Sequence, residues 1–68
     1  MQISTRNQLK GKIKELKKGP VSTEVIVEIG GQTLVVASIT TGSADSMGLK
    51  VGDDVSALVK ASSVMIMK

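Results

Sequence analysis

The 68-residue sequence lacks cysteine, histidine and all three aromatic residues. Without cysteine and histidine the chain cannot form disulfides, and almost every transition-metal site is excluded. Without aromatic residues the core must consist of aliphatic side chains and methionine, which lack the large area that a buried aromatic contributes. A chain of this length buries only about 60% of its unfolded surface. Small folds with so little core are often supported by oligomerisation, and we expect subunit interfaces that complete the core.

Long hydrophobic runs are also missing. The first residues contain no apolar signal-peptide core, and no run reaches the roughly 18–20 residues that a membrane-spanning helix needs. We therefore expect a cytoplasmic chain with no membrane partner. Nine basic and six acidic residues give a net charge of +3, which favours anionic partners without identifying one.

Catalytic groups are scarce. Nucleophilic catalysis most often places Ser, Cys or Thr beside His, and here only a lysine or a carboxylate could act as the base. The one adjacent acidic pair, Asp53–Asp54, follows Gly52 in a predicted turn, where acidic residues are common. We expect no enzymatic activity, and neither a metal cation nor a nucleotide as cofactor.

The apolar residues that are present alternate with polar ones, which predicts β-strands. In the first strand Leu9, Gly11 and Ile13 share one face, and the glycine indicates a bulge or a sharp bend. Gly30–Gly31 predicts a hairpin turn, and the almost continuous apolar run after it predicts a strand buried on both faces. The five predicted strands cover residues 7–19, 23–30, 33–40, 55–60 and 64–68.

A short helix is predicted between the third and fourth strands. Thr40, Thr41 or Ser43 can cap its start, Met47 is its last residue, and Gly48 can end it in a left-handed conformation. This order is typical of an OB-fold, a partly open Greek-key barrel of five strands. We predict an all-β, OB-fold-like barrel with one short helix, forming a single domain over residues 1–68. An SH3-like barrel is the structural alternative.

Nucleic acid is one candidate ligand for a basic OB-fold. Lys10, Lys12 and Lys14 lie on one face of the first predicted strand and could follow a phosphate backbone. Single-strand binders of this type also stack bases on aromatic side chains, which are absent here. A solvated strand face that discourages edge-to-edge pairing explains the lysines better, so a nucleic-acid-binding module is the second hypothesis for function.

A small oxyanion is the other candidate ligand, because donor side chains gather in short segments. Residues 4–7 supply hydroxyl, guanidinium and amide donors, and residues 60–63 supply an ammonium, two hydroxyls and backbone N–H groups at a bend. Thr40 and Thr41 follow the third strand. Backbone N–H groups in a bend can form an anion-binding nest, although polar termini and serine-rich bends are each usually turn chemistry. The residues alone indicate a small oligomeric β-barrel with a possible anion site.

Two motifs resemble those of the molbindins, a family of small molybdate-binding proteins. The segment STRNQLKG over residues 4–11 is similar to the family's amino-terminal signature, Ser-Ala-Arg-Asn-x-Leu-x-Gly, and VKASSV over residues 59–64 is similar to its ending. The resemblance covers nearly the whole chain. Two positions depart from the family pattern: Thr5 stands where alanine is common, and Pro20 where a small residue is usual.

The resemblance implies an OB-like domain that binds molybdate, with tungstate as an analogue, for storage or homeostasis. It also implies a homohexamer, a trimer of dimers, that holds oxyanions between subunits. For Thr5 and Asn7, anion binding and a role in backbone contacts or packing are both open. The expected oxyanion-binding residues are Ser4, Thr5, Arg6, Asn7, Thr40, Lys60, Ala61 and Ser62.

Overall fold

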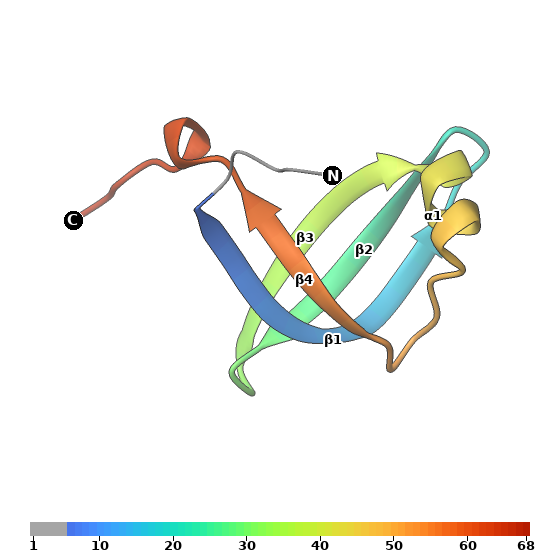
Figure 1. Ribbon diagram of the computed structural model, residues 1–68, viewed down its shortest axis with the longest axis horizontal. Helices are drawn as coiled ribbons and strands as arrows, with labels where there is room; N and C mark the ends of the chain where they lie inside the picture. Colours follow the sequence, from blue (N-terminus) through green and yellow to red (C-terminus); the bar gives the residue numbers. More distant parts are fainter. Residues whose placement is uncertain (1–5) are drawn as a thin grey trace.

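The computed structural model describes residues 6–68. Within this range four antiparallel strands form one sheet in the order β3-β2-β1-β4, as Figure 1 shows. Helix α1 links β3 to β4, and the short 3-10 helix η1 follows β4. The elements are β1 (Asn7–Lys18), β2 (Ser22–Ile29), β3 (Thr33–Thr40), α1 (Thr41–Met47), β4 (Asp54–Val59) and η1 (Ala61–Ser63).

The long strand β1 bends and pairs with two different strands along its length. Its first half pairs with β4 and its second half with β2, and the strand curves between them (Figure 1). Gly11 lies at this change of partner, where a Cβ atom would collide with the main-chain oxygen of Glu28. The predicted role of this glycine in a bend is confirmed. The bulge lies elsewhere, because the register with β2 shifts between Ile13 and Glu15.

The core lies on the concave face of the sheet. Ile13, Val25 and Val27 are almost completely buried, which confirms the alternation predicted for the first two strands. The smaller or half-buried apolar residues packed around them are Leu16, Ile29, Ala37, Ile39, Leu49 and Val55. A chain without aromatic residues thus builds its core from aliphatic side chains of all four strands and of the loop after α1.

Helix α1 begins and ends as predicted. The hydroxyl of Thr40 accepts a hydrogen bond from the backbone N–H of Ser43 at 3.1 Å, and Gly48 ends the helix with φ of 63°. The start of α1 is tied to the sheet by Thr41, whose hydroxyl donates to the Gly19 carbonyl oxygen at 2.6 Å. Thr41 also lies 2.9 Å from the buried hydroxyl of Thr23. In the part of the chain described, no helix is long and apolar enough to cross a bilayer.

One expectation about the strands is wrong for the described single chain. Residues 64–68 do not form a fifth strand in the described chain, because η1 turns them away from both edges of the sheet (Figure 1). The outer face of β3 is open: Val36 is 61% exposed, so residues 6–68 of one chain do not by themselves supply the burial on both faces that is expected for this strand. The result is an open sheet of four antiparallel strands over residues 6–68, without the fifth strand of the predicted barrel.

Candidate functional site

The start of β1 and the end of β4 lie side by side. Asn7 is paired with Val59, so the chain enters the sheet at Arg6 and leaves it at Lys60 on adjacent strands. Two donor segments that are far apart in the sequence therefore meet at one corner of a single chain (Figure 1). We call this group the basic corner; its members are Arg6, Asn7, Lys60, Ala61 and Ser62.

The basic corner offers hydrogen-bond donors without competing carboxylates. Apart from the half-buried Asn7, its residues are exposed. Among residues 6–68 neither Arg6 nor Lys60 forms an ion pair. Lys60 occupies the N-cap position of η1 without a side-chain capping bond. The first backbone N–H groups of η1, those of Ala61 and Ser62, have no acceptor among the described residues. A guanidinium, an ammonium, hydroxyls and backbone N–H groups together form a set that suits an acceptor-only anion.

Thr40 does not belong to this corner within one chain. It lies at the end of β3, paired with Ser22, and so at the opposite end of the sheet from Asn7 (Figure 1). Its hydroxyl is engaged by the cap of α1 and also donates to the hydroxyl of Ser43 at 2.8 Å. Two other predicted site residues, Ser4 and Thr5, lie outside the described residues.

The lysine face of β1 is largely neutralised. The Lys12 ammonium lies 2.8 Å from a carboxylate oxygen of Asp54, and the Lys14 ammonium lies 3.7 Å from one of Glu28. The hydrogen bond to Asp54, and then its charge, raise the pKa of Lys12 above the usual 10.5. Of the three lysines only Lys10 has no ion pair within residues 6–68. This face therefore does not present the continuous positive strip that a phosphate backbone requires.

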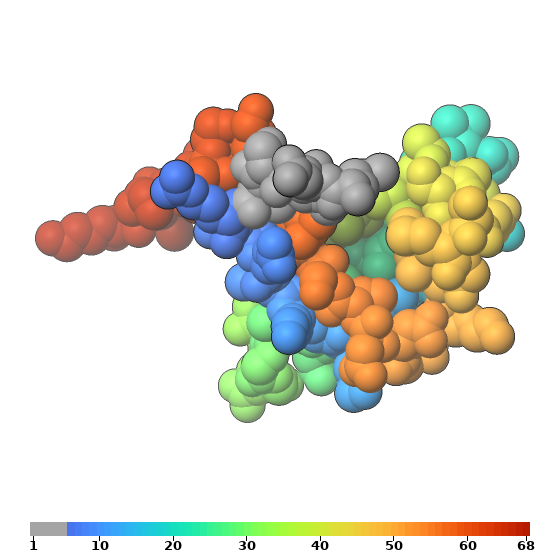
Figure 2. All heavy atoms as spheres, in the orientation of Figure 1, coloured from blue at the N-terminus to red at the C-terminus, as the bar shows by residue number. Residues whose placement is uncertain are grey.

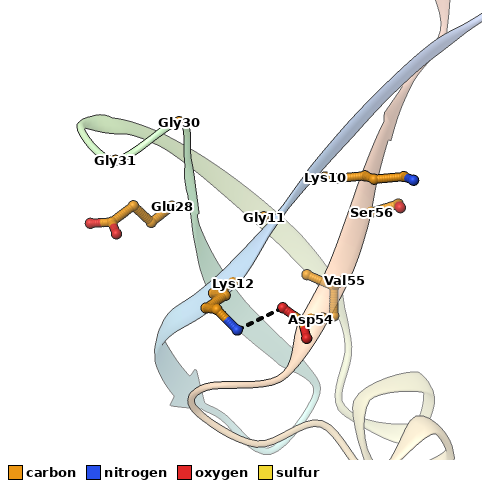
Figure 3. A pocket seen from close by; sticks show the side chains of 9 residues that line it. All are labelled: Lys10, Gly11, Lys12, Glu28, Gly30, Gly31, Asp54, Val55 and Ser56. Carbon is orange, nitrogen blue, oxygen red and sulfur yellow. Dashed lines mark hydrogen bonds and ion pairs between the residues drawn. The ribbon is translucent and has the colours of Figure 1, made fainter.

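An open hollow of about 650 Å³, which no sequence motif marks, lies beside this face. Figure 3 shows that Lys12 and Asp54 bond to each other, while the side chains of Lys10 and Glu28 point in opposite directions. The charged groups do not converge on a common point, so the hollow does not resemble a binding site. The residues that line it are Lys10, Gly11, Lys12, Glu28, Gly30, Gly31, Asp54, Val55 and Ser56.

Residues 6–68 contain no group of three or more acidic side chains that could hold a metal ion. The acidic residues are instead distributed along the lysines of β1. Lys17 lies 3.8 Å from Glu24 and 4.0 Å from Glu15, and Lys18 lies 2.7 Å from Asp45. The described chain therefore offers its donors to an anion at the basic corner and nowhere gathers ligands for a cation.

Comparison with known proteins places the chain in a family. The model of the TOBE domain matches residues 3–66. Molybdenum-pterin-binding protein 2 of Clostridium pasteurianum is 46% identical over 67 residues, which cover 98% of each chain. The probable molybdenum-pterin-binding protein of Haemophilus influenzae is 38% identical over 97% of this chain and 96% of its own.

Solved structures agree with this assignment. MopII from Clostridium pasteurianum superposes with a TM-score of 0.91 at 45% identity, covering 98% of this chain and all of its own. A molybdate-binding protein from Sporomusa ovata superposes with a TM-score of 0.93 at 41% identity over the full length of both chains. The cytoplasmic molybdate-binding protein ModG with molybdate bound gives 0.83 at 44% identity, over 90% of this chain and 43% of its own. The chain thus belongs to the TOBE domain family and, within it, to the molybdenum-pterin-binding proteins.

Proposed function

We propose that this chain, acting as one domain over residues 1–68, binds molybdate reversibly in the cytoplasm for storage or homeostasis and performs no catalysis. The observation that carries the proposal is the basic corner, where Arg6 and Lys60 flank the paired ends of β1 and β4 without carboxylate partners among residues 6–68. The related molybdate-binding proteins support the choice of anion. The residues proposed to bind are Ser4, Thr5, Arg6, Asn7, Thr40, Lys60, Ala61 and Ser62.

The donor set explains how such a site could select its anion. Molybdate at neutral pH is a dianion whose four oxygens only accept hydrogen bonds. Phosphate has a second pKa of about 6 and often keeps a proton that needs an acceptor, and a site of donors leaves that proton unpaired. Sulfate, like molybdate, carries no proton at neutral pH, so a site of donors does not reject it. Its exclusion therefore depends on its smaller size. Tungstate is nearly the size of molybdate and is expected to bind as an analogue.

The position of Thr40 supports a site shared between subunits. Because Thr40 lies at the far end of the sheet from Asn7, one chain cannot bring it to its own basic corner, whereas a neighbouring chain can supply it. A homohexamer built as a trimer of dimers, as the family resemblance implies, would provide such shared sites. The exposed outer face of β3, with Val36 and Leu34, is apolar surface that an assembly can cover.

The bare oxyanion suits this chain better than a pterin-bound form of molybdenum. Several relatives carry pterin in their names. A pterin is a flat heterocycle, and proteins commonly hold such rings by stacking aromatic side chains against them. The chain has no aromatic residue, and its donors are of the kind that binds a small anion.

Equilibrium dialysis of the purified protein against molybdate, with excess sulfate present throughout, tests the proposal. Saturable uptake that survives the sulfate is the expected result, and tungstate should compete for the same sites. Absence of uptake would overturn the proposal. A parallel titration with single-stranded RNA should show no salt-dependent binding, because Lys12 and Lys14 are already paired with carboxylates.

A further inference from the structure

Lys10 is an exposed cation that lies close to the basic corner without belonging to it. It stands on β1, three residues from Asn7, and is paired with Ser56 of β4. It forms no ion pair within residues 6–68, and the residue is exposed. In Figure 2 the first half of β1 (blue) lies at the surface beside β4 (orange). An anion in solution can therefore approach this part of the strand.

The two carboxylates that line the open hollow beside Lys10 do not pair with it. Asp54 accepts a hydrogen bond from the Lys12 ammonium at 2.8 Å. The side chain of Glu28 points in the opposite direction from that of Lys10 (Figure 3) and lies 3.7 Å from the Lys14 ammonium. The charge of Lys10 therefore acts on the solution without a neighbouring carboxylate to cancel it.

The alternation of side chains along β1 places Lys10 in a row that leads to Arg6. Side chains two residues apart share a face of a strand, so Lys10 and Gln8 lie on the face opposite to the buried Ile13. Arg6 follows in the same row, just before β1 begins. Four residues of extended chain span about 13 Å, and charges act over about 30 Å at an ionic strength of about 0.01 M. Lys10 is therefore near enough to influence an anion that approaches the basic corner.

We propose that Lys10 steers the incoming dianion toward the basic corner and does not hold it once bound, a role that rests on the function proposed above. A cation at the rim of a site raises the association rate, and its effect depends on salt. A group in direct contact with the bound anion acts chiefly on the dissociation rate. Arg6 and Lys60 flank the paired strand ends and have the second role, whereas Lys10 has the first.

The other lysines of β1 are poorly suited to steering. Each of them lies within 4.0 Å of a carboxylate. By Coulomb's law the field of such a pair falls off faster with distance than the field of a single charge. Among the lysines of β1, Lys10 therefore has the field that reaches furthest into solution. The paired lysines are Lys12, Lys14, Lys17 and Lys18.

Rapid filtration with radioactive molybdate tests the steering role, because uptake gives the association rate constant and a chase with unlabelled molybdate gives the dissociation rate constant. At an ionic strength of about 0.01 M, Lys10→Gln should lower the association rate constant about twofold and Lys10→Glu about fourfold. The dissociation rate constant should stay within about 1.3-fold in both variants. At about 0.5 M salt the differences from the natural protein should vanish. The control Lys17→Gln removes the same charge at the far end of β1 and should change neither rate constant by more than about 1.3-fold.

Two results would overturn the steering role while leaving the proposed function intact. An association rate constant that does not follow the charge at position 10 would show that the anion does not respond to Lys10. Faster dissociation from Lys10→Gln, persisting at high salt, would show that Lys10 contacts the bound anion. If the natural protein takes up no molybdate, the proposed function fails and the steering role fails with it. Urea denaturation of the variants should match that of the natural protein, because Lys10 is exposed and has no ion pair within residues 6–68.

Discussion

The two halves of β1 carry cations in different electrostatic surroundings. From Lys12 to Lys18 every lysine lies within 4.0 Å of a carboxylate. At the other end, Lys10 has no ion pair within residues 6–68, and neither has Arg6 just before β1 or Lys60 just after the adjacent strand β4. Exposed ion pairs contribute only about 0–1 kcal/mol each, so their main effect here is to cancel charge. Part of the net positive charge of this chain is therefore concentrated around the basic corner.

The largest expected effect comes from neutralising one cation in each half. Arg6→Ala should weaken molybdate binding by about 10- to 100-fold, since a hydrogen bond to a charged group contributes about 1.5–3 kcal/mol. Lys17→Ala removes the same charge from the paired half and should leave the dissociation constant within about twofold, because its field is already cancelled. Isothermal titration of both variants measures the contrast. Equal losses would show that the anion responds to total charge and not to the basic corner.

The bend at Gly11 separates the two halves, and filling it should be costly. In Gly11→Ala the new Cβ would meet the main-chain oxygen of Glu28 and would lie 2.9 Å from a methyl group of Val27. We expect a loss of about 1–3 kcal/mol in the free energy of unfolding, measured by urea denaturation. Gly42→Ala is the matched control, because a Cβ there meets nothing within 4 Å and an alanine in a helix gains up to ~1 kcal/mol. A Gly11→Ala variant as stable as the natural protein would contradict the crowded bend.

Two variants of Thr40 can separate its role in capping α1 from a role in binding the anion. Thr40→Ala removes the cap of α1 and should cost about 1 kcal/mol of stability, whereas Thr40→Ser retains the hydroxyl that accepts from the Ser43 N–H. If Thr40 also contacts the anion of a neighbouring subunit, the alanine variant should lose affinity and the serine variant should keep most of it. Thermal unfolding and equilibrium dialysis on the two variants give both quantities. An alanine variant with unchanged affinity would remove Thr40 from the site.

The smallest expected effect concerns the pair between Lys12 and Asp54. Because folding raises the pKa of Lys12, the pair stabilises the folded state fully below the unfolded value of 10.5 and loses this contribution as pH rises through the folded pKa. Asp54→Asn should therefore lower the melting temperature slightly at pH 7, and the difference from the natural protein should vanish above the folded pKa. High salt should also reduce the difference. A difference that persists at high pH would indicate that Asp54 stabilises the local backbone at the start of β4 and that its charge is not responsible.

Features that depend on neighbouring residues could be predicted from the sequence. The alternation around Ile13 and Val25 identified the buried faces, because side chains alternate along any strand. The caps of α1 at Thr40 and Gly48 were predicted because capping uses groups only a few residues apart. The donor segments around Arg6 and Lys60 were also visible, but the alternation could not show that they meet in one chain.

Features that depend on distant partners could not be predicted. The tail over residues 64–68 has strand composition, yet strands form only where a partner edge lies within reach, and η1 directs the tail elsewhere. The hollow beside Gly11 and the pairing of Lys12 with Asp54 each depend on segments about 40 residues apart. No local pattern marks such contacts.

The sequence by itself determined the strand faces, the hairpin at Gly30–Gly31 and the helix caps, since these follow from residue type and spacing of a few residues. Only the tertiary structure decided which cations lie beside carboxylates. The register that pairs Asn7 with Val59 brings Arg6 and Lys60 together, and the same sheet sets Lys12 against Asp54. Coulomb interactions between side chains depend on their distance in space, and that distance is set by strand pairing, not by separation along the chain.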